Sequence, residues 1–279
     1  MIYEPEQLGQ SRNDLADRLR ELRKQAGLTG DRLARRCNMS QSQISKFETG
    51  RKTPRLLDVE RILRALDAPP EVLADVLTLA RIANTEWQDK RSSWRRGLEK
   101  RQAELATLEA DSNEIRYFLP GMITGLLAIP EYIRASLTHS PGDISKTVAR
   151  KLERQAVLYD KSKHFTFLLT EQAVRWEIVP GPAMAVQIDR LVSLSRLPHV
   201  RLGVVPAGPA APRGPMNTFT IYDDRLVTVE NFTGRIVFRE FRDIAEHRNI
   251  FNQFEQAALL GDSARKQLSQ WAETYRVDL

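Results

Sequence analysis

The sequence predicts an α+β protein with an all-α amino-terminal domain, a long helical connector and a mixed α/β carboxy-terminal domain. Up to residue 70, apolar residues recur at helical spacing between short breaks that contain glycine or proline. Residues 71–113 contain no proline and a single glycine, as expected of long helices. After Tyr117, runs typical of β-strands alternate with helical stretches. We therefore place the domains at 11–70, 71–113 and 114–279.

The composition is that of a globular protein. Of its 279 residues, 42% are hydrophobic and 28% are charged, and no apolar run approaches the roughly 18 residues that a membrane span needs. The first ten residues show neither the basic nor the apolar region of a secretory signal, so we expect a cytoplasmic protein. The single cysteine, Cys37, and four scattered histidines offer no pair at metal-ligand spacing. We expect no metal and no other cofactor.

Four helices are expected in the amino-terminal domain. The first ends at Gly27, because glycine commonly terminates helices in the left-handed conformation. Thr29 and Ser40 are the expected N-caps of the second and third helices, and Gly50 ends the third. Pro54 suits the first turn of a fourth helix.

The third expected helix carries polar side chains opposite its apolar positions, Ile44 and Phe47. In a helix-turn-helix, two short helices joined by a tight turn let the second helix place its amino-terminal side chains in the DNA major groove. There, glutamine pairs with adenine and lysine donates to guanine. The residues expected to contact base edges are Gln41, Ser42, Gln43, Ser45 and Lys46.

Basic residues gather around these two helices. Between residues 30 and 55 there are seven lysines and arginines but two acids. Helix amino termini and basic side chains attract phosphate without reading the base sequence. The residues expected to contact phosphate are Thr29, Arg32, Arg36, Arg51, Lys52 and Thr53. The sequence therefore predicts a transcriptional regulator that binds double-stranded DNA at specific sites.

This segment resembles the repressor/Cro-type helix-turn-helix of the Xre family. The resemblance rests on LTGDRLA (28–34), SQSQISKFETG (40–50) and Pro54. In that family the second helix usually begins with a glutamine that touches phosphate and buttresses the recognition helix, whereas Gly30 stands here. Glu48 matches the family's glutamate, for which the resemblance implies a capping and turn role. An alternative function remains open, a protein-interaction module that keeps a degenerate helix-turn-helix for assembly. Gly30 favours it, and the basic, polar third helix argues against it.

The connector is expected to form one or two long helices from Glu71 to about Asn113. Between Arg81 and Arg101 there are seven bases and three acids. Trp87 and Trp94 are spaced seven residues apart, which places them on one helical face. We expect these tryptophans to pack on the second domain and the charged side chains to be solvated.

The carboxy-terminal domain is expected to mix strands and helices. Strands are predicted at 164–169, 201–205, 218–222, 226–230 and 235–238. Helices are predicted at 145–161, 182–196 and over much of 240–275. The pair Asp223 and Asp224 suits a hairpin turn between two of the strands.

Most of residues 94–260 resembles the effector-like domain of WhiJ-like regulators of actinobacteria. The matching strings are YFLPGMITGLLAIPEYIRA (117–135), RKLERQ (150–155), FTFLLTEQAVR (165–175) and VRLGVVP (200–206). Such regulators occur beside small toxin-like partner proteins and are often called antitoxin-like. The resemblance implies that this domain binds a small acidic or neutral partner protein or an unknown signal.

Six polar residues adjoin apolar elements in the matching strings, and two interpretations of them stay open. They line a pocket for the partner or signal, or they form structural contacts, such as an ion pair between a glutamate and a nearby arginine. The residues are Tyr132, Arg150, Arg154, Gln155, Glu171 and Arg175.

The sequence does not indicate an enzyme, because its histidines have no catalytic motif around them and its glycines form no phosphate-binding loop. A DNA-binding domain of about 55 residues covers one half-site, and tight specific binding usually joins two such units by symmetry. We therefore expect a homodimer whose contacts lie after Glu71 or in the second domain. We expect no membrane association.

Overall fold

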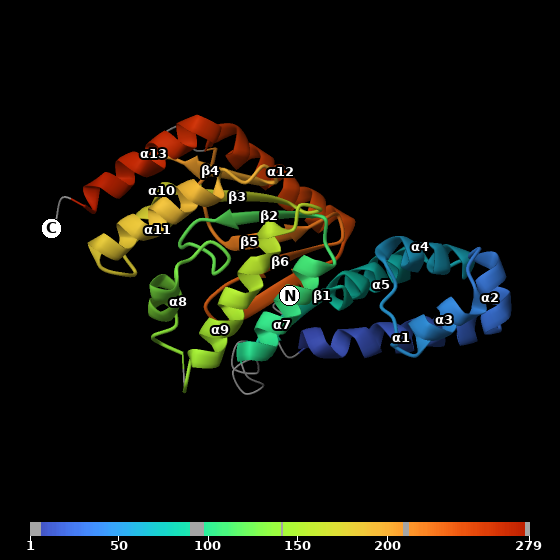
Figure 1. The fold of residues 1–279 in the computed structure, drawn as a ribbon. Helices are drawn as coiled ribbons and strands as arrows, with labels where there is room; N and C mark the ends of the chain where they lie inside the picture. Colours follow the sequence, from blue (N-terminus) through green and yellow to red (C-terminus); the bar gives the residue numbers. More distant parts are fainter. Residues whose placement is uncertain (1–6, 90–97, 141, 209–211, 277–279) are drawn as a thin grey trace. The chain divides into compact units, whose positions relative to one another are not determined.

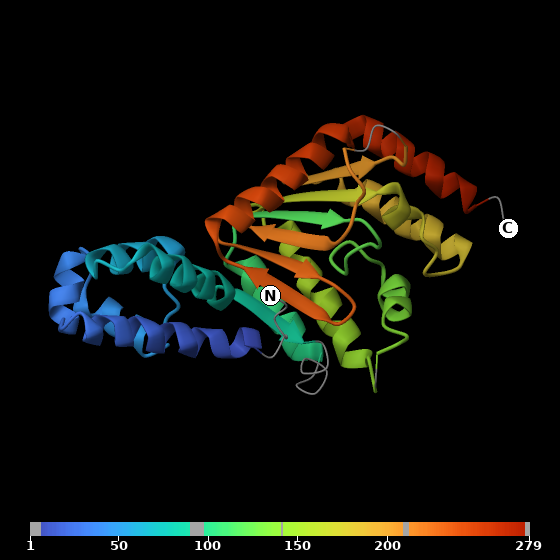
Figure 2. The same ribbon diagram turned by 180° about the vertical axis from the view of Figure 1, so that it is seen from behind.

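The computed structural model describes residues 7–89, 98–140, 142–208 and 212–276 (Figures 1 and 2). Its contacts divide the chain into two compact units. The first unit extends to Trp87 and includes residues 236–243, whereas the second comprises residues 88–235 and 244–279. The chain is an α+β protein, with a helical amino-terminal region followed by a mixed sheet and its helices.

The first unit is built from five described helices around one apolar core. Buried Leu19, Leu33 and Phe47 come from three different helices, and Val76 and Ala80 close the core from the fifth. The helices are α1 (Gln7–Gln25), α2 (Gly30–Arg36), α3 (Gln41–Glu48), α4 (Leu56–Ala65) and α5 (Pro70–Ala83). The predicted helices are therefore present, and the fifth helix belongs to the same core.

Two predictions about this part of the chain are wrong. Pro54 lies before α4 and not in its first turn, since Arg55 is extended (φ −69°, ψ 157°) and the Pro54 carbonyl accepts a hydrogen bond of 3.0 Å from Asn84 Nδ2. The predicted connector is not helical throughout, because strand β1 (Thr85–Asp89) follows α5. Residues 85–89 form a strand because they pair with a neighbouring strand of the sheet, and not because of a signal in the local sequence. The side chains of Trp87 and Trp94 lie outside the described residues.

The second unit contains most of a mixed β-sheet. The strand order in the whole sheet is β1-β7-β6-β5-β2-β3-β4-β8. Strand β2 pairs in parallel with β3 and antiparallel with β5, and β3 pairs in parallel with β4. Beyond β1, the strands are β2 (Glu114–Leu119), β3 (His164–Thr170), β4 (Val200–Val205), β5 (Thr218–Tyr222), β6 (Leu226–Glu230), β7 (Gly234–Phe238) and β8 (Leu259–Leu260).

Helices cover both faces of this sheet. In Figure 1, α7 and α9 cross one face, and Figure 2 shows α12 along the opposite side. On the α12 side, the ring of Phe254 lies 4.5 Å from that of Phe118, and the rings of Phe251 and Phe219 lie 6.5 Å apart. The helices after β1 are α7 (Leu98–Ala110), α8 (Pro130–Ser136), α9 (Ser145–Arg154), α10 (Glu171–Arg175), α11 (Gly181–Leu194), α12 (Phe241–Ala257) and α13 (Gly261–Thr274), with a 3₁₀ helix, η1 (Gln155–Tyr159), after α9.

The strand predictions agree with the structure to within a residue, and the turn at Asp223 has the left-handed φ of 49°. The helix predicted over 145–161 ends at Arg154 and continues as η1. The stretch 240–275 holds two helices, because strand β8 intervenes and Gly261 adopts a φ of +56°. The central strand, β2, had no counterpart among the predicted elements.

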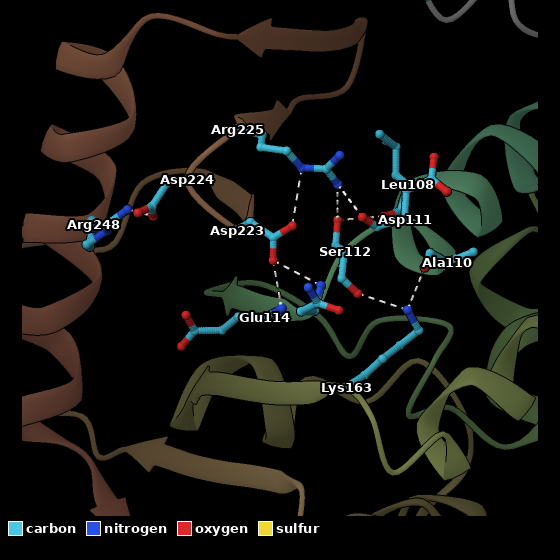
Figure 3. Close-up of polar contacts among 11 residues, drawn as sticks. Leu108, Ala110, Asp111, Ser112, Glu114, Lys163, Asp223, Asp224, Arg225 and Arg248 are labelled. Atoms are coloured by element: carbon cyan, nitrogen blue, oxygen red, sulfur yellow. Dashed lines mark hydrogen bonds and ion pairs between the residues drawn. The ribbon is translucent and has the colours of Figure 1, made fainter.

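A network of polar contacts fixes the junction between α7 and β2 (Figure 3). Asp223 Oδ1 accepts hydrogen bonds from the backbone of Asn113 (3.0 Å) and Glu114 (2.8 Å). The Arg225 guanidinium donates to Ser112 Oγ at 2.9 Å, and Lys163 Nζ donates to the Ser112 carbonyl at 2.9 Å. These contacts hold the last turn of α7 against the sheet.

None of the described helices is long and apolar enough to cross a membrane. Among the described residues, no group of three or more His, Cys, Asp or Glu side chains is placed to hold a metal ion.

Candidate nucleic-acid interface

Side-chain caps define the two helices of the helix-turn-helix. Thr29 Oγ1 accepts a hydrogen bond from Arg32 N at 3.3 Å, and Ser40 Oγ accepts one from Gln43 N at 3.1 Å. Each cap satisfies an amide that would otherwise lack a partner at the start of the helix. Between the helices, Asn38 adopts a φ of 52°, which makes the turn tight. The local sequence therefore sets where α2 and α3 begin.

The inner face of α3 anchors it to the rest of the unit. Ile44 and Phe47 are buried, as their spacing predicts. Glu48 is also buried and binds Arg23 of α1 through two hydrogen bonds, Nε to Oε1 at 2.7 Å and Nη2 to Oε2 at 2.8 Å. The hydrogen bond to Glu48 raises the pKa of Arg23. Glu48 therefore ties α3 to α1, a contact that its expected capping role does not include, and Arg23 was missed because it lies 25 residues away.

The outer face of α3 presents the residues predicted to contact bases. Gln41, Ser42, Ser45 and Lys46 are exposed, and Gln43 is half-buried. All five lie on one short helix that is held at both ends. The arrangement offers amide, hydroxyl and ammonium groups to a partner, which is the chemistry that reads base edges.

Gly30, the first residue of α2, faces α3. A Cβ at this position would lie 3.8 Å from Gln41 Nε2, an ordinary van der Waals distance. The side-chain amide of Gln41 therefore lies next to position 30, where members of the Xre family usually carry a glutamine.

The residues predicted to contact phosphate are not equivalent in the structure. Thr29, Arg32, Arg51 and Lys52 are exposed, and Lys52 Nζ also lies 6.0 Å from the centre of the Phe47 ring. Arg36 is exposed as well, but it donates a hydrogen bond of 3.1 Å to the Ala65 carbonyl at the end of α4.

Thr53 is half-buried and does not cap a helix, because α4 begins three residues later. The expected phosphate site at the amino terminus of α4 therefore does not include Thr53.

The six polar residues considered for partner or ligand binding do not form one site. Tyr132 and Arg154 line the same cavity in the second unit. Gln155 supports the wall of that cavity, since its Nε2 donates to the carbonyls of Gly125 (2.8 Å) and Ala128 (2.7 Å).

The other three residues lie elsewhere. Arg150 is exposed and pairs with Glu153 of the same helix at 2.8 Å. Arg175 pairs with Glu171 at 2.7 Å beside a separate hollow, which Tyr275 also lines. For Glu171 and Arg175, the structure thus gives the ion pair that the sequence left as an alternative.

Two protein families match the chain. Residues 14–76 match a family described as a helix-turn-helix domain. Residues 102–270 match a family described as a domain of unknown function, DUF5753. The chain belongs to the DUF5753 family. In this DUF5753 protein, the helix-turn-helix match spans most of α1, all of α2 to α4 and the first half of α5, and the DUF5753 match spans β2 to β8. No curated protein matches the sequence.

The solved structures that are similar to this DUF5753 protein include the following two. One is a phospholipase D family member, Nuc from Salmonella typhimurium, at 7% identity and a TM-score of 0.39, with 63% of this chain and 97% of that chain covered. The other is TrmBL2, an archaeal chromatin protein whose structure is described as showing a novel mode of DNA binding. It is 11% identical with a TM-score of 0.35, and the match covers 72% of this chain and 65% of TrmBL2. Scores this low do not establish a shared fold.

Proposed function

We propose that this protein is a sequence-specific DNA-binding transcriptional regulator and not an enzyme. One observation carries the proposal: α3 presents a row of exposed polar side chains, and its caps and the Arg23–Glu48 pair hold it in place. Docked in the major groove, Gln41 would pair with adenine and Lys46 would donate to guanine. Ser42, Gln43 and Ser45 would complete the contacts to base edges.

Exposed basic groups beside α3 would bind the DNA backbone. Arg32, Arg51 and Lys52 would contact phosphate, and the amides at the start of α2, behind Thr29, would add a backbone contact. Such contacts release counterions, so the binding constant falls as salt rises. Arg36 would reach phosphate after giving up its hydrogen bond to Ala65.

The test is to select binding sites for the full-length protein from random DNA and then to measure affinity over a range of salt concentrations. A regulator selects a defined sequence, and Arg51→Ala or Lys52→Ala each reduces the slope of log K against log salt by about 1. Arg64→Ala is the matched control, because Arg64 is an exposed base that pairs with Glu60 on α4. Its slope should equal that of the wild type.

An interaction module with a degenerate helix-turn-helix is the second candidate, which Gly30 favours. Such a protein would select no sequence and would show no affinity for DNA that falls steeply with salt. Either result would refute the proposal that this protein is a DNA-binding regulator and would favour the interaction module.

We also propose that the protein binds DNA in the cytoplasm as a homodimer, since two half-sites give tight specific binding. Light scattering that gives a monomer with and without DNA would refute this. In line with the resemblance to Xre-family and WhiJ-like, antitoxin-like regulators, the DUF5753 unit would receive a small partner protein or another signal. Co-purification of a small protein with the full-length chain tests the partner.

A further inference from the structure

The second unit contains a cavity of about 290 Å³ between the sheet and the helices that cross it. Strands β2, β5 and β6 form one wall, and α7, α8, α9 and the loop before α8 form the other. The volume lies just below the range of about 300–1,000 Å³ that is typical of ligand pockets. The cavity therefore suits a small metabolite.

A row of hydroxyl-bearing residues crosses the sheet at the cavity. In the strand register, Tyr117 lies opposite Thr220, and Thr220 lies opposite Thr228, so the three side chains share one face. Thr147 of α9 faces them from the other wall. Thr147, Thr220 and Thr228 are only 5%, 6% and 2% exposed.

The hydroxyl groups of these three threonines make no hydrogen bond to any residue that the structure describes, whereas Tyr117 donates to Glu109. None of the three hydroxyl oxygens is sealed off from solvent, although the residues are buried, so these groups are open to the cavity and can bond to water or to a ligand there. Each hydroxyl both donates and accepts, which suits the hydroxyl, carbonyl and amide groups of a ligand.

A buried ion pair forms another part of the wall. Arg154 Nε lies 3.0 Å from Glu109 Oε2, and both side chains are buried. Tyr117 donates to Glu109 Oε1 at 2.7 Å, and Arg154 also donates to Gln102. The pair costs desolvation energy that apolar residues would avoid. Its presence beside the unpartnered threonines makes this wall polar.

The charged groups of the cavity balance one another. The acids Glu109 and Glu230 and the bases Lys151 and Arg154 all line the cavity, so their formal charges sum to zero. A ligand with net charge would find no excess of opposite charge here. Leu119, Ile133 and Leu137 give the cavity apolar surface as well, which suits one face of a ring.

We propose that this cavity binds a small uncharged molecule rich in hydroxyl and carbonyl groups, of monosaccharide or nucleoside size. Thr147, Thr220 and Thr228 hydrogen-bond to it, and the apolar residues cover its ring. The role of this ligand as the signal of the regulator rests on the proposed function, whereas binding to the cavity does not.

The test uses ligand-observed NMR on the full-length protein without DNA, so that it fails or succeeds independently of DNA binding. Three pools are compared at millimolar concentration: neutral monosaccharides and nucleosides, anionic dicarboxylates and inorganic phosphate, and cationic diamines. A member of the neutral pool should bind, and the charged pools should not.

The double variant Thr220→Val/Thr228→Val removes two hydroxyls at constant shape and should weaken binding roughly tenfold or more. It should also melt no lower than the wild type, because neither hydroxyl has a protein partner. Thr166→Val is the matched control, since Thr166 belongs to the same sheet but lies in register with Arg116, on the other face. It should bind as the wild type does.

Three results would overturn the proposal. The first is that no neutral compound binds, which would mean that the cavity holds water only. The second is that charged compounds bind as well as neutral ones. The third is that the double variant keeps wild-type affinity for the compound that binds.

Discussion

Replacing Glu48 with alanine should loosen the attachment of α3 to α1. The carboxylate receives two hydrogen bonds from Arg23, and the same guanidinium donates to the Leu28 carbonyl at 2.8 Å. The variant would leave a largely buried guanidinium without its counter-ion. The exposed fractions of the Arg23 and Glu48 side chains are 15% and 10%.

The cost follows from this burial. Removing one partner of a buried ion pair destabilises a protein by about 3–5 kcal/mol. Because some water reaches both side chains, we expect the lower limit, about 3 kcal/mol. The pair Asp17–Arg20 on α1 gives a matched control, since its side chains are 58% and 45% exposed. Asp17→Ala should cost at most about 1 kcal/mol.

Hydrogen exchange measures this effect within the first unit. The relevant amides are those of α1 and α3 that exchange when the unit opens. They should exchange roughly a hundredfold faster in Glu48→Ala than in the wild type. Asp17→Ala should change their exchange rates by less than about tenfold. Equal rates in Glu48→Ala and Asp17→Ala would refute the anchoring role of Glu48.

Two further predictions concern glycine positions and pH. Gly50→Ala should destabilise the protein by more than about 1 kcal/mol, because φ is +67° at this position and a Cβ would lie 3.0 Å from Asn13 Oδ1. Gly30→Ala, at the start of a helix, should stabilise the protein by about 0.5–1 kcal/mol. Urea denaturation measures both changes. The reverse order would contradict the assigned conformations. Burial raises the pKa of Glu109 above its ordinary value despite the opposing effect of Arg154. The folded state therefore holds this proton to higher pH, so the wild type should lose stability relative to Glu109→Gln as pH rises from the ordinary glutamate pKa to the raised one. Parallel stability curves for the two proteins over this range would show that the shift is absent.

The elements that the sequence predicted are those with local signals. Strands β5 and β6 match their predicted limits because the turn at Asp223 separates two short β-favouring runs. Strand β2 escaped prediction because Ile115–Leu119 is buried almost throughout, so the alternation of a half-exposed strand is missing. Strand β1 depends on its partner strand, which no local pattern reveals.

In the candidate sites, too, the sequence predicted the features that have a local signal and not those that depend on contacts between distant segments. The exposed face of α3 follows from helical periodicity once Ile44 and Phe47 are assigned to the core. The Arg23–Glu48 pair and the hydrogen bond of Arg36 to α4 depend on contacts between distant segments. The cavity joins residues of separate strands and helices. Its one local signal was the alternation in β5, where Thr218 and Thr220 point to the cavity and Phe219 to α12.

The central claim, that α3 reads the base sequence, is tested most directly by one ratio. This is the affinity for the selected site divided by the affinity for random DNA, measured for the wild type and for Gln41→Ala/Lys46→Ala. Each lost base contact is worth about 1–3 kcal/mol, so the double variant should lose most of its preference for the selected site while it still binds random DNA. Arg51→Ala should lower both affinities and leave the ratio unchanged. A double variant that keeps the wild-type ratio would contradict the assignment of α3 as the recognition helix.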